Sequence, residues 1–237
     1  PMSGHVIRVL DFETTGTEPP AQVCEVGICD LTQLADGSWD VGEPDSWLCG
    51  GIDVMPPEVR AVHHITLDDL VGAPPFDRAD VFKGSPVPVA IAAHSYSFES
   101  SFLGEHGLTS ICTYKAALRI WPDAPGHSNQ VLRYWLEDQG LISLDHATAM
   151  PPHRAGPDAY VTAHILKAIL ATGAAGKDLA AWTREPALLP RCTIGKFRGK
   201  PWAEVEGGFL DWMLRQADMD EGLKWNARRE LDRRRVA

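Results

Sequence analysis

The sequence predicts an α/β protein in which helices pack on a mixed β-sheet. Strand-like runs of apolar, β-branched residues come first, and segments with helical spacing of apolar residues dominate the later part of the chain. Of the 237 residues, 44% are hydrophobic and 23% are charged, which is an ordinary globular composition. A chain of this length can form one sizeable core and a small appendage.

The first expected elements are two strands joined by a turn. Residues 6–12 (VIRVLDF) and 22–31 (QVCEVGICDL) are apolar and β-branched, and the TTGTEPPA segment between them has turn composition. A short helix is expected to begin near Pro57 and to end before Thr66. The Ala-rich run VPVAIAA at 87–93 predicts a fully buried strand.

The middle of the chain predicts a helix, a short strand and a second helix. Residues 97–107 place their large apolar side chains on one helical face, and Gly107 is expected to end that helix. A strand is expected at 110–113, followed by a helix that stops at Pro122. The helical face of the 97–107 segment consists of Phe98, Phe102 and Leu103.

Two longer helices are expected at 128–140, with Ser128 as the N-cap, and at 157–173, with Pro157 in the first turn. Both repeat apolar residues at helical spacing, which predicts one core-facing side for each. The expected core positions are Val131, Leu132, Trp135 and Leu136 in the first helix and Val161, Ile165, Ala168 and Ile169 in the second.

The chain is expected to divide into a main domain at 1–175, a helix and linker at 176–191 and a small basic α+β module at 192–237. Residues 191–237 carry 11 Lys and Arg against 8 Asp and Glu, whereas residues 1–190 carry 11 against 24. So acidic a main domain is a poor indiscriminate binder of nucleic acid, although bound divalent cations would neutralise several of its carboxylates.

The sequence predicts a cytoplasmic protein without a membrane partner. It contains no run of about 18 apolar residues that would span a bilayer, and its first residues lack the basic and apolar regions of a secretory signal. The five cysteines include no C-x-x-C pair, which argues against a disulfide framework or a zinc site.

Four carboxylates and one histidine are the candidate catalytic residues: Asp11, Glu13, Glu99, Asp158 and His153. Asp11 and Glu13 stand two positions apart on a predicted strand, so they share a face. Two adjacent acids repel each other unless a cation lies between them, which makes the pair a candidate site for a hard metal ion. Taken singly, each acid has a simpler explanation, because solvated strand ends, helix surfaces and helix N-termini commonly carry carboxylates.

The order of three motifs resembles the DEDDh superfamily of 3′–5′ exonucleases. The motifs are DFETTG at 11–16, AHSYSFE at 93–99 and H-x4-D-A at 153–159, and the superfamily pattern is D-x-E-T-T-G, H-N-x-x-F-D and H-x4-D. Within it, the 112–136 segment and the tail motifs IGKFRGKPWAEV and GGFLDWML are similar to the exonuclease X family. The resemblance covers nearly the whole chain and implies a ribonuclease-H-like fold for residues 1–175.

The resemblance also implies a two-metal hydrolysis that releases 5′-mononucleotides, with Mg²⁺ or Mn²⁺ as the two divalent cations. It implies that Asp11 bridges both ions, that Glu13 and Asp158 hold the ion that orients the attacking water, and that Glu99 acts mostly through water at the other ion. His153 would remove the proton of the water as the general base.

Two residues depart from the superfamily pattern: Glu99 replaces an aspartate and Ser95 replaces an asparagine. A glutamate is one methylene longer and can still reach a metal or its waters, whereas the serine lacks an amide that both donates and accepts. The resemblance further implies that Thr14 and Thr15 cradle the terminal nucleotide and that His63 and Ile65 pack on the terminal base.

Three cations in the tail, Lys196, Arg198 and Lys200, alternate with period two and predict a strand with one basic face. Such a face would contact a DNA backbone or would simply be solvated.

The leading hypothesis is a metal-dependent exodeoxyribonuclease that trims single-stranded, frayed or mismatched DNA 3′ ends in repair or end-processing. An exoribonuclease is the second hypothesis, because no residue settles the choice of sugar. An impaired nuclease that acts as a nucleic-acid-binding adaptor is the third, and only Glu99 and Ser95 support it. A homodimer stays open, since no interface signature is evident.

Overall fold

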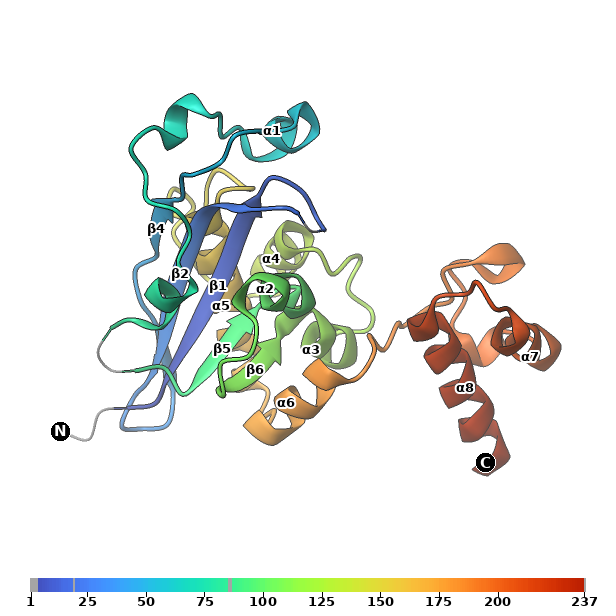
Figure 1. Cartoon of the computed structure of the whole chain (residues 1–237). Helices are drawn as coiled ribbons and strands as arrows, with labels where there is room; N and C mark the ends of the chain where they lie inside the picture. The colour runs from blue at the N-terminus through green and yellow to red at the C-terminus, as the bar shows by residue number, and fades with distance from the viewer. Residues whose placement is uncertain (1–3, 19, 85–86, 237) are drawn as a thin grey trace.

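The structure is a computed structural model that describes residues 4–18, 20–84 and 87–236. Its main body is a mixed β-sheet flanked by helices (Figure 1), which confirms the predicted α/β fold. The strand order is β3-β2-β1-β5-β6, with β4 paired to β2; β1 runs parallel to β5 and antiparallel to β2, and β5 runs parallel to β6. The strands are β1 (Val6–Thr14), β2 (Val23–Gln33), β3 (Trp39–Val41), β4 (Asp45–Leu48), β5 (Ala90–Ala93) and β6 (Thr109–Cys112).

Helices cover both faces of the sheet. The α-helices are α1 (Pro57–His63), α2 (Tyr96–Leu103), α3 (Thr113–Ile120), α4 (Asn129–Asp138), α5 (Ala155–Ala171), α6 (Gly176–Arg184), α7 (Gly207–Arg215) and α8 (Glu221–Val236). Short 3₁₀ helices are η1 (Asp68–Leu70), η2 (Arg78–Phe82), η3 (Gly195–Phe197) and η4 (Trp202–Glu204). One apolar core joins the sheet to α3, α4, α5 and α6, and a second joins it to α2 and η2. Helix α5 is buried on nearly all sides because it packs directly on β1 and β2.

Several predicted boundaries were wrong for local reasons. Helix α2 ends at Gly104 and not at Gly107: Gly104 adopts φ 63°, a conformation that glycine adopts without strain. Helix α5 begins at Ala155, two residues before Pro157, because the first helical turn needs no N–H donor from proline. In α4, Leu132 and Leu136 are buried whereas Val131 is exposed, so the core-facing side is narrower than predicted.

The predicted basic strand of the tail was also wrong. Lys196 lies in η3, and an isolated bridge between Arg191 and Pro201 takes the place of a strand. Gly195 and Gly199 flank the segment with φ values of 59° and 82°, which extended strands do not contain. The tail is therefore helical and not α+β.

The C-terminal helices share an apolar cluster of their own. It contains Cys192, Phe197, Trp202, Val205, Leu210, Met213 and Ala227. The side-chain amide of Asn226 donates to the carbonyl of Ala187 and accepts from the backbone N–H of Leu189, at 2.9 and 3.0 Å. We therefore name residues 187–236 the C-terminal module, while the division of the chain into functional domains stays a prediction.

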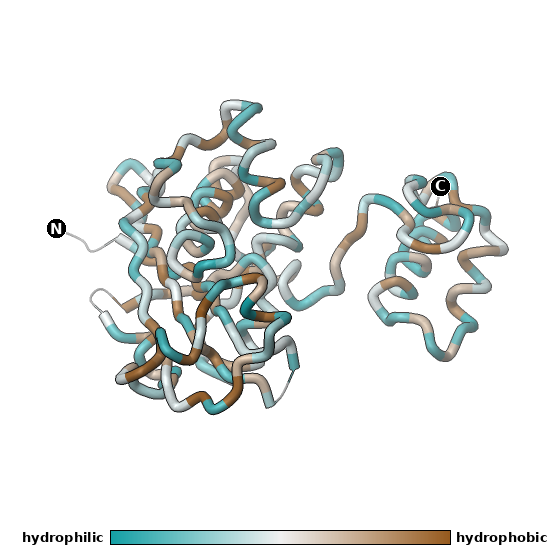
Figure 2. The backbone as a smooth tube through the Cα atoms, turned by 90° about the horizontal axis from the view of Figure 1, so that it is seen from above, coloured by the Kyte–Doolittle hydropathy of each residue, from teal (hydrophilic) through white to brown (hydrophobic). Residues whose placement is uncertain are grey.

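An extended segment leads from α6 into the C-terminal module (Figure 2). Glu185 at its start is tied to α3, because its carboxylate pairs with Arg119 at 2.6 Å and its carbonyl accepts from the Lys115 ammonium at 2.7 Å. Across the described ranges, every helix falls short of the length and apolarity that a membrane crossing requires.

Candidate active site

The carboxyl ends of β1 and β5 lie at the same edge of the sheet because these strands are parallel neighbours. Asp11 and Glu13 occupy the end of β1 and face the same side, since side chains two positions apart share a face. The chain leaves β5 at the same edge and enters α2. Glu99 in the first turn of α2 is only 4% exposed.

A close contact at Gly27 brings α5 to this edge. Gly27 is the register partner of Asp11 on β2, and a Cβ added at Gly27 would lie 2.0 Å from the carbonyl carbon and oxygen of Ala155. The first turn of α5 therefore rests on the backbone of β2 directly beside Asp11. This contact sets Asp158, in that first turn, next to the acids of β1.

The result is a compact carboxylate cluster. One oxygen from each of Asp11, Glu13 and Asp158 lies within 4.8 Å of the others. The buried Oε2 atom of Glu99 has no hydrogen-bond partner among the residues described by the structure. A buried carboxylate oxygen without a partner is costly, and hard oxygen ligands are those that divalent cations such as Mg²⁺ prefer. The four side chains therefore fit a metal centre.

Burial raises the pKa of each of the four acids, and repulsion from neighbouring acids adds to the rise for Asp11 and Glu13. Burial raises the pKa of Asp11 well above its usual range, and the charges of Asp158, Glu99 and Glu13 add to the effect. Burial, followed by the charge of Asp158, raises the pKa of Glu13 to about 8, and burial raises that of Glu99 to about 8. For Asp158, burial again raises the pKa while hydrogen bonds oppose the rise. A bound cation would favour the ionised forms.

Asp158 is fixed by partners from two directions. Its Oδ1 accepts from Nε2 of Gln130 on α4 at 2.9 Å, and its Oδ2 accepts from the backbone N–H of His153 at 2.6 Å. The side chain of Asn129 donates to the carbonyl of Asp158 at 3.3 Å. No sequence motif marks Gln130 or Asn129, which precede the apolar stripe of α4.

An ion pair that no sequence motif marks anchors the loop before α5. The Arg154 guanidinium donates two hydrogen bonds to the Glu25 carboxylate, from Nε at 2.9 Å and from Nη2 at 2.6 Å, and the N–H of Ala155 donates to the same group at 3.0 Å. Glu25 is the register partner of Glu13 on β2. The sequence signals this pair only through Glu25, one of two acids in the predicted strand at 22–31.

His153 lies at the exposed rim of the cluster. Its backbone adopts φ 60°, an uncommon conformation for a residue other than glycine. The side chain is exposed, while its backbone N–H and the adjacent Arg154 hold the loop to Asp158 and Glu25. The imidazole is thus open to solvent on a loop that is fixed at both sides.

The predicted substrate contacts occupy different environments. Thr14 is buried and donates to the carbonyl of Gly16, and the Thr15 hydroxyl accepts from the N–H of Gln22. Ser95 is exposed at the start of α2. His63 and Ile65 are each 2% exposed, and Ile65 belongs to an apolar cluster with Cys24, Met55 and Leu70. Contact of His63 or Ile65 with substrate stays a prediction that this packing does not favour.

No model of a protein family matches the chain. The sequence is 30% identical over 219 residues to Exodeoxyribonuclease 10 of Escherichia coli strain K12, and the match covers 90% of this chain and 92% of that protein. The chain belongs to the exonuclease X family. It is accordingly a 3′–5′ exonuclease of the DEDDh superfamily, as the ordered motifs predict.

Solved structures agree with this family. A structure of exonuclease X in complex with 5′-overhanging duplex DNA matches with a TM-score of 0.59 and 28% identity, over 75% of this chain and 99% of that chain. The zinc-bound complex of Escherichia coli ExoI with single-stranded DNA matches with a TM-score of 0.53 over 74% of this chain and 42% of that chain. At 15% identity the second match speaks for the fold alone.

Proposed function

We propose that this exonuclease hydrolyses DNA, releasing 5′-mononucleotides from single-stranded or frayed 3′ ends. The carboxylate cluster at the end of β1 is the observation that carries the proposal, because its three acids lie within 4.8 Å of one another. The choice of DNA is supported by the name of the family relative, an exodeoxyribonuclease that this chain matches over 90% of its length. RNA is the alternative substrate, and the experiment below distinguishes the two.

In this proposal Asp11, Glu13, Glu99 and Asp158 hold two divalent cations, Mg²⁺ or Mn²⁺. Such ions, when bound, stabilise the attacking and departing oxygens of an in-line phosphoryl displacement. Asp11 would contribute to both ion positions, Glu13 and Asp158 would hold the ion that orients the attacking water, and Glu99 would act at the ion near the leaving 3′ oxygen. The raised pKa values of Asp11 and Glu13 and the unpartnered oxygen of Glu99 support this assignment.

His153 is the proposed general base. Its imidazole would accept the proton of the attacking water and later release it to solvent. The exposure of this side chain beside Asp158 supports the role. Glu99, which replaces the usual aspartate, still contributes a carboxylate to the site, and this favours an active enzyme over an impaired one.

The remaining proposed contacts concern the terminal nucleotide. Thr14 and Thr15 follow the carboxylates at the end of β1, where the bulge between Glu13 and Thr14 turns the chain. Ser95 is exposed at the start of the helix that carries Glu99. We propose that these three residues line the nucleotide site, with their backbone groups and hydroxyls as the polar contacts.

A degradation assay with 5′-labelled single-stranded DNA and matched RNA, in Mg²⁺, Mn²⁺ and EDTA, tests the proposal. We expect a metal-dependent ladder that shortens from the 3′ end on DNA and is weak on RNA. Asp11→Asn should abolish the ladder, and His153→Ala should slow it by roughly 10²–10⁴-fold with little effect on Mn²⁺ affinity. Degradation of RNA alone, or full activity of either variant, would contradict the proposal.

A further inference from the structure

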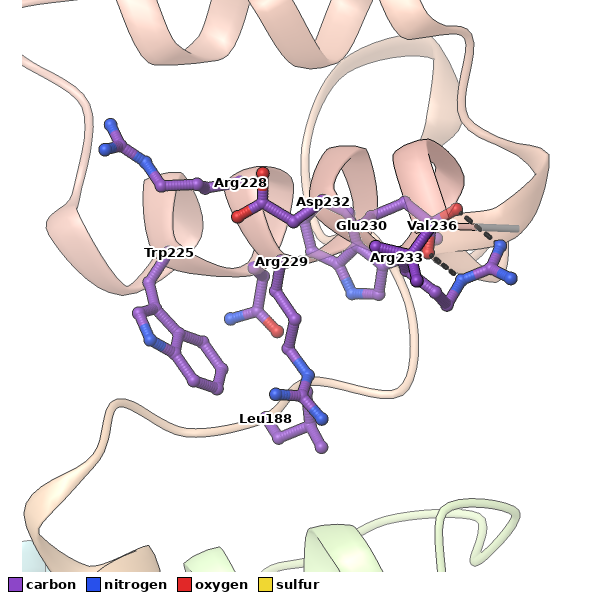
Figure 3. A pocket seen from close by; sticks show the side chains of 10 residues that line it. Leu188, Trp225, Arg228, Arg229, Glu230, Asp232, Arg233 and Val236 are labelled. Atoms are coloured by element: carbon purple, nitrogen blue, oxygen red, sulfur yellow. Dashed lines mark hydrogen bonds and ion pairs between the residues drawn. The ribbon is translucent and has the colours of Figure 1, made fainter.

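Helix α8 presents an aromatic and basic face that the proposed active site does not use. Trp225, Arg228, Arg229, Asp232 and Arg233 recur at the three- and four-residue spacing that places side chains on one side of a helix. Together with Leu188 of the incoming segment they line a groove of about 660 Å³ (Figure 3). This volume lies within the usual range of ligand sites.

Two arginines of this face are open to a ligand. Arg233 and Arg234 pair with Glu230, and Arg235 pairs with Asp232. Arg228 and Arg229 are exposed, and within the described ranges neither forms an ion pair. They therefore provide positive charge that α8 itself does not neutralise.

Trp225 lies beside these charges and is half-buried. The Arg229 guanidinium lies 5.5 Å from the centre of the indole ring, and both side chains point toward Leu188 in Figure 3. An indole with a neighbouring guanidinium combines a surface on which a base can stack with a donor group for a phosphate. Bases are available for such stacking only when they are unpaired.

The cations that the sequence first suggested for DNA contact are already engaged. Lys196 pairs with Glu206 at 3.1 Å, and Lys200 lies 3.6 Å from Glu204. Arg198 donates to the carbonyl of Thr193 at 2.9 Å. The basic surface of the module with fewer internal partners is therefore the face of α8.

The uneven distribution of charge along the chain favours binding of a polyanion at the C-terminal module rather than at the preceding residues. The C-terminal module carries 11 Lys and Arg against 8 Asp and Glu, whereas the preceding residues carry 11 against 24. Burial lowers the pKa of Arg119 on α3, and the positive charge of Arg229 lowers it further. Arg229 is therefore close enough to the main body to interact electrostatically with α3.

We propose that the α8 groove binds the single-stranded part of the substrate behind its 3′ end. One base stacks on Trp225, and the adjoining phosphates contact Arg228 and Arg229. The inference rests on the proposed function, because the strand held at the groove is the one that the carboxylate cluster shortens. The groove raises affinity for long strands and takes no part in hydrolysis.

Fluorescence anisotropy of the full-length protein in EDTA tests this inference, since no cleavage occurs without metal. The probes are 5′-labelled oligothymidylates of about 30 and about 5 nucleotides, the longer of which exceeds the usual single-strand site size. Trp225→Ala should weaken binding of the long probe by roughly tenfold to a hundredfold, and Trp225→Phe should restore most of it. Arg228→Gln with Arg229→Gln should lower the slope of log K against log salt by about 1.4, or about 0.7 for each phosphate contact.

The double variant Lys196→Gln with Lys200→Gln removes the same charge from another segment of the module and is the matched control. We expect it to change the long-probe affinity far less than the arginine pair, and we expect no variant to change affinity for the short probe. If the arginine and lysine double variants lower the affinity for the long probe equally, the inference is overturned, even if Trp225→Ala fails to fold. Polyglutamate at equal charge serves as a competitor for the long probe. If it displaces the probe, and if Trp225→Ala weakens binding of polyglutamate but not of DNA, the groove binds acidic peptides. That result would also overturn the inference.

Cleavage in Mg²⁺ separates this inference from the proposed function. If the wild-type protein leaves DNA intact while the α8 variants still lose long-strand affinity, the proposed function fails and the groove stands. If DNA is degraded and the α8 variants bind long strands as the wild type does, the groove fails and the proposed function stands.

Discussion

Arg154 is expected to support hydrolysis by positioning its neighbours, because it contacts Glu25 and not the carboxylate cluster. The Glu25 side chain is 3% exposed and that of Arg154 is 39% exposed. Because solvent screens the exposed partner, breaking this pair should cost less than breaking a fully buried one. We therefore expect Arg154→Ala to lower the free energy of unfolding by about 2 kcal/mol. The loop with His153 and the start of α5 would then lose their anchor, and kcat should fall while KM changes little.

Arg8→Ala provides a control in the same sheet, because Arg8 on β1 pairs with an acid on β2, the strand that also carries Glu25. Arg8 pairs with Asp30 through Nε and Nη2 at 2.8 and 2.7 Å, at the end of β1 away from the cluster. Unfolding in urea should show a loss of stability for both variants, but kcat per folded molecule should fall only for Arg154→Ala. An equal kcat for the two variants would show that Arg154 serves stability alone.

Glu99 gives the metal-free protein a pH dependence of known sign. Its pKa is raised by burial from 4.5 to about 8 in the folded chain, so the folded state binds more protons than the unfolded state between these values. The contribution of Glu99 to stability is therefore fully present below pH of about 4.5 and is lost as pH rises toward 8. In EDTA, the unfolding free energy of Glu99→Gln should therefore fall less steeply with pH than that of the wild-type protein. The difference in slope should be about 1.4 kcal/mol per pH unit between the two pKa values.

Chemical denaturation at several pH values measures this effect. Mg²⁺ or Mn²⁺ should reverse the loss of stability at high pH, because a bound cation favours the ionised carboxylates. An equal pH dependence of stability for the wild-type protein and Glu99→Gln between pH 5 and pH 8 in EDTA would contradict the prediction.

Among single residues, the sequence identifies the proposed chemical groups better than the residues that hold them. Asp11, Glu13 and Asp158 stand in ordered motifs, and the structure brings these three together. Glu25 is 129 positions away from Arg154, and Gln130 is 28 positions away from Asp158. These contacts exist only after the strands pair and α4 packs on α5, so no local pattern reveals them.

At the level of elements, the contact between α5 and β2 controls the geometry of the cluster. A methyl group on Gly27 would overlap the carbonyl of Ala155 at 2.0 Å, so Gly27→Ala must push the first turn of α5 away from Asp11. We expect a loss of about 1–3 kcal/mol of stability from overpacking and a much weaker affinity for Mn²⁺ as Asp158 moves. Calorimetric titration with Mn²⁺ measures the affinity directly.

Gly176→Ala is the matched control, because a Cβ there meets nothing within 4 Å. It begins α6, where alanine is the better helix former, so neither stability nor Mn²⁺ affinity should fall. Unchanged Mn²⁺ affinity in Gly27→Ala would mean that the cluster tolerates movement of α5.

Elements with strong apolar periodicity are predictable from this sequence, and short or irregular ones are not. The β1, β2 and α5 segments are long and apolar, and their positions agree with the prediction to within about two residues. Strands β3 and β4 have three and four residues with mostly exposed or half-exposed side chains. Such strands exist because β2 offers them a free edge, which is information that their own residues do not contain.

For the molecule as a whole, we expect the main body to keep its chemistry without the C-terminal module. None of the apolar clusters that join the sheet to its helices includes a residue beyond 186. Deletion of residues 187–237 should therefore leave kcat on an oligonucleotide of about 5 nucleotides unchanged and remove the salt-sensitive extra affinity for long strands. An unchanged affinity for long strands across salt concentrations would show that the module serves something other than DNA.

The arrangement of the molecule is only partly predictable from the sequence. The charge split at residue 191 and the change of composition predict an appended unit from residue 192. The side chain of Asn226 and the indole N–H of Trp202 bind the backbone of residues 187–189, so the contacts of the C-terminal module extend to Ala187, while the division into functional domains stays a prediction. Trp202 and Asn226 lie far along the chain from residues 187–189, so local composition does not reveal these contacts.

Pro186 is the residue between two anchored ends. Glu185 is fastened to α3 on one side, and Ala187 is fastened to Asn226 on the other. The proline ring holds φ near −65°, so this junction is a short and conformationally restricted linker. The range of orientations that the module can adopt is therefore small. A DNA strand bound at the α8 groove is then present at high effective concentration near the carboxylate cluster. We expect such an enzyme to retain its substrate between successive cleavages by geometry, with modest affinity at each site.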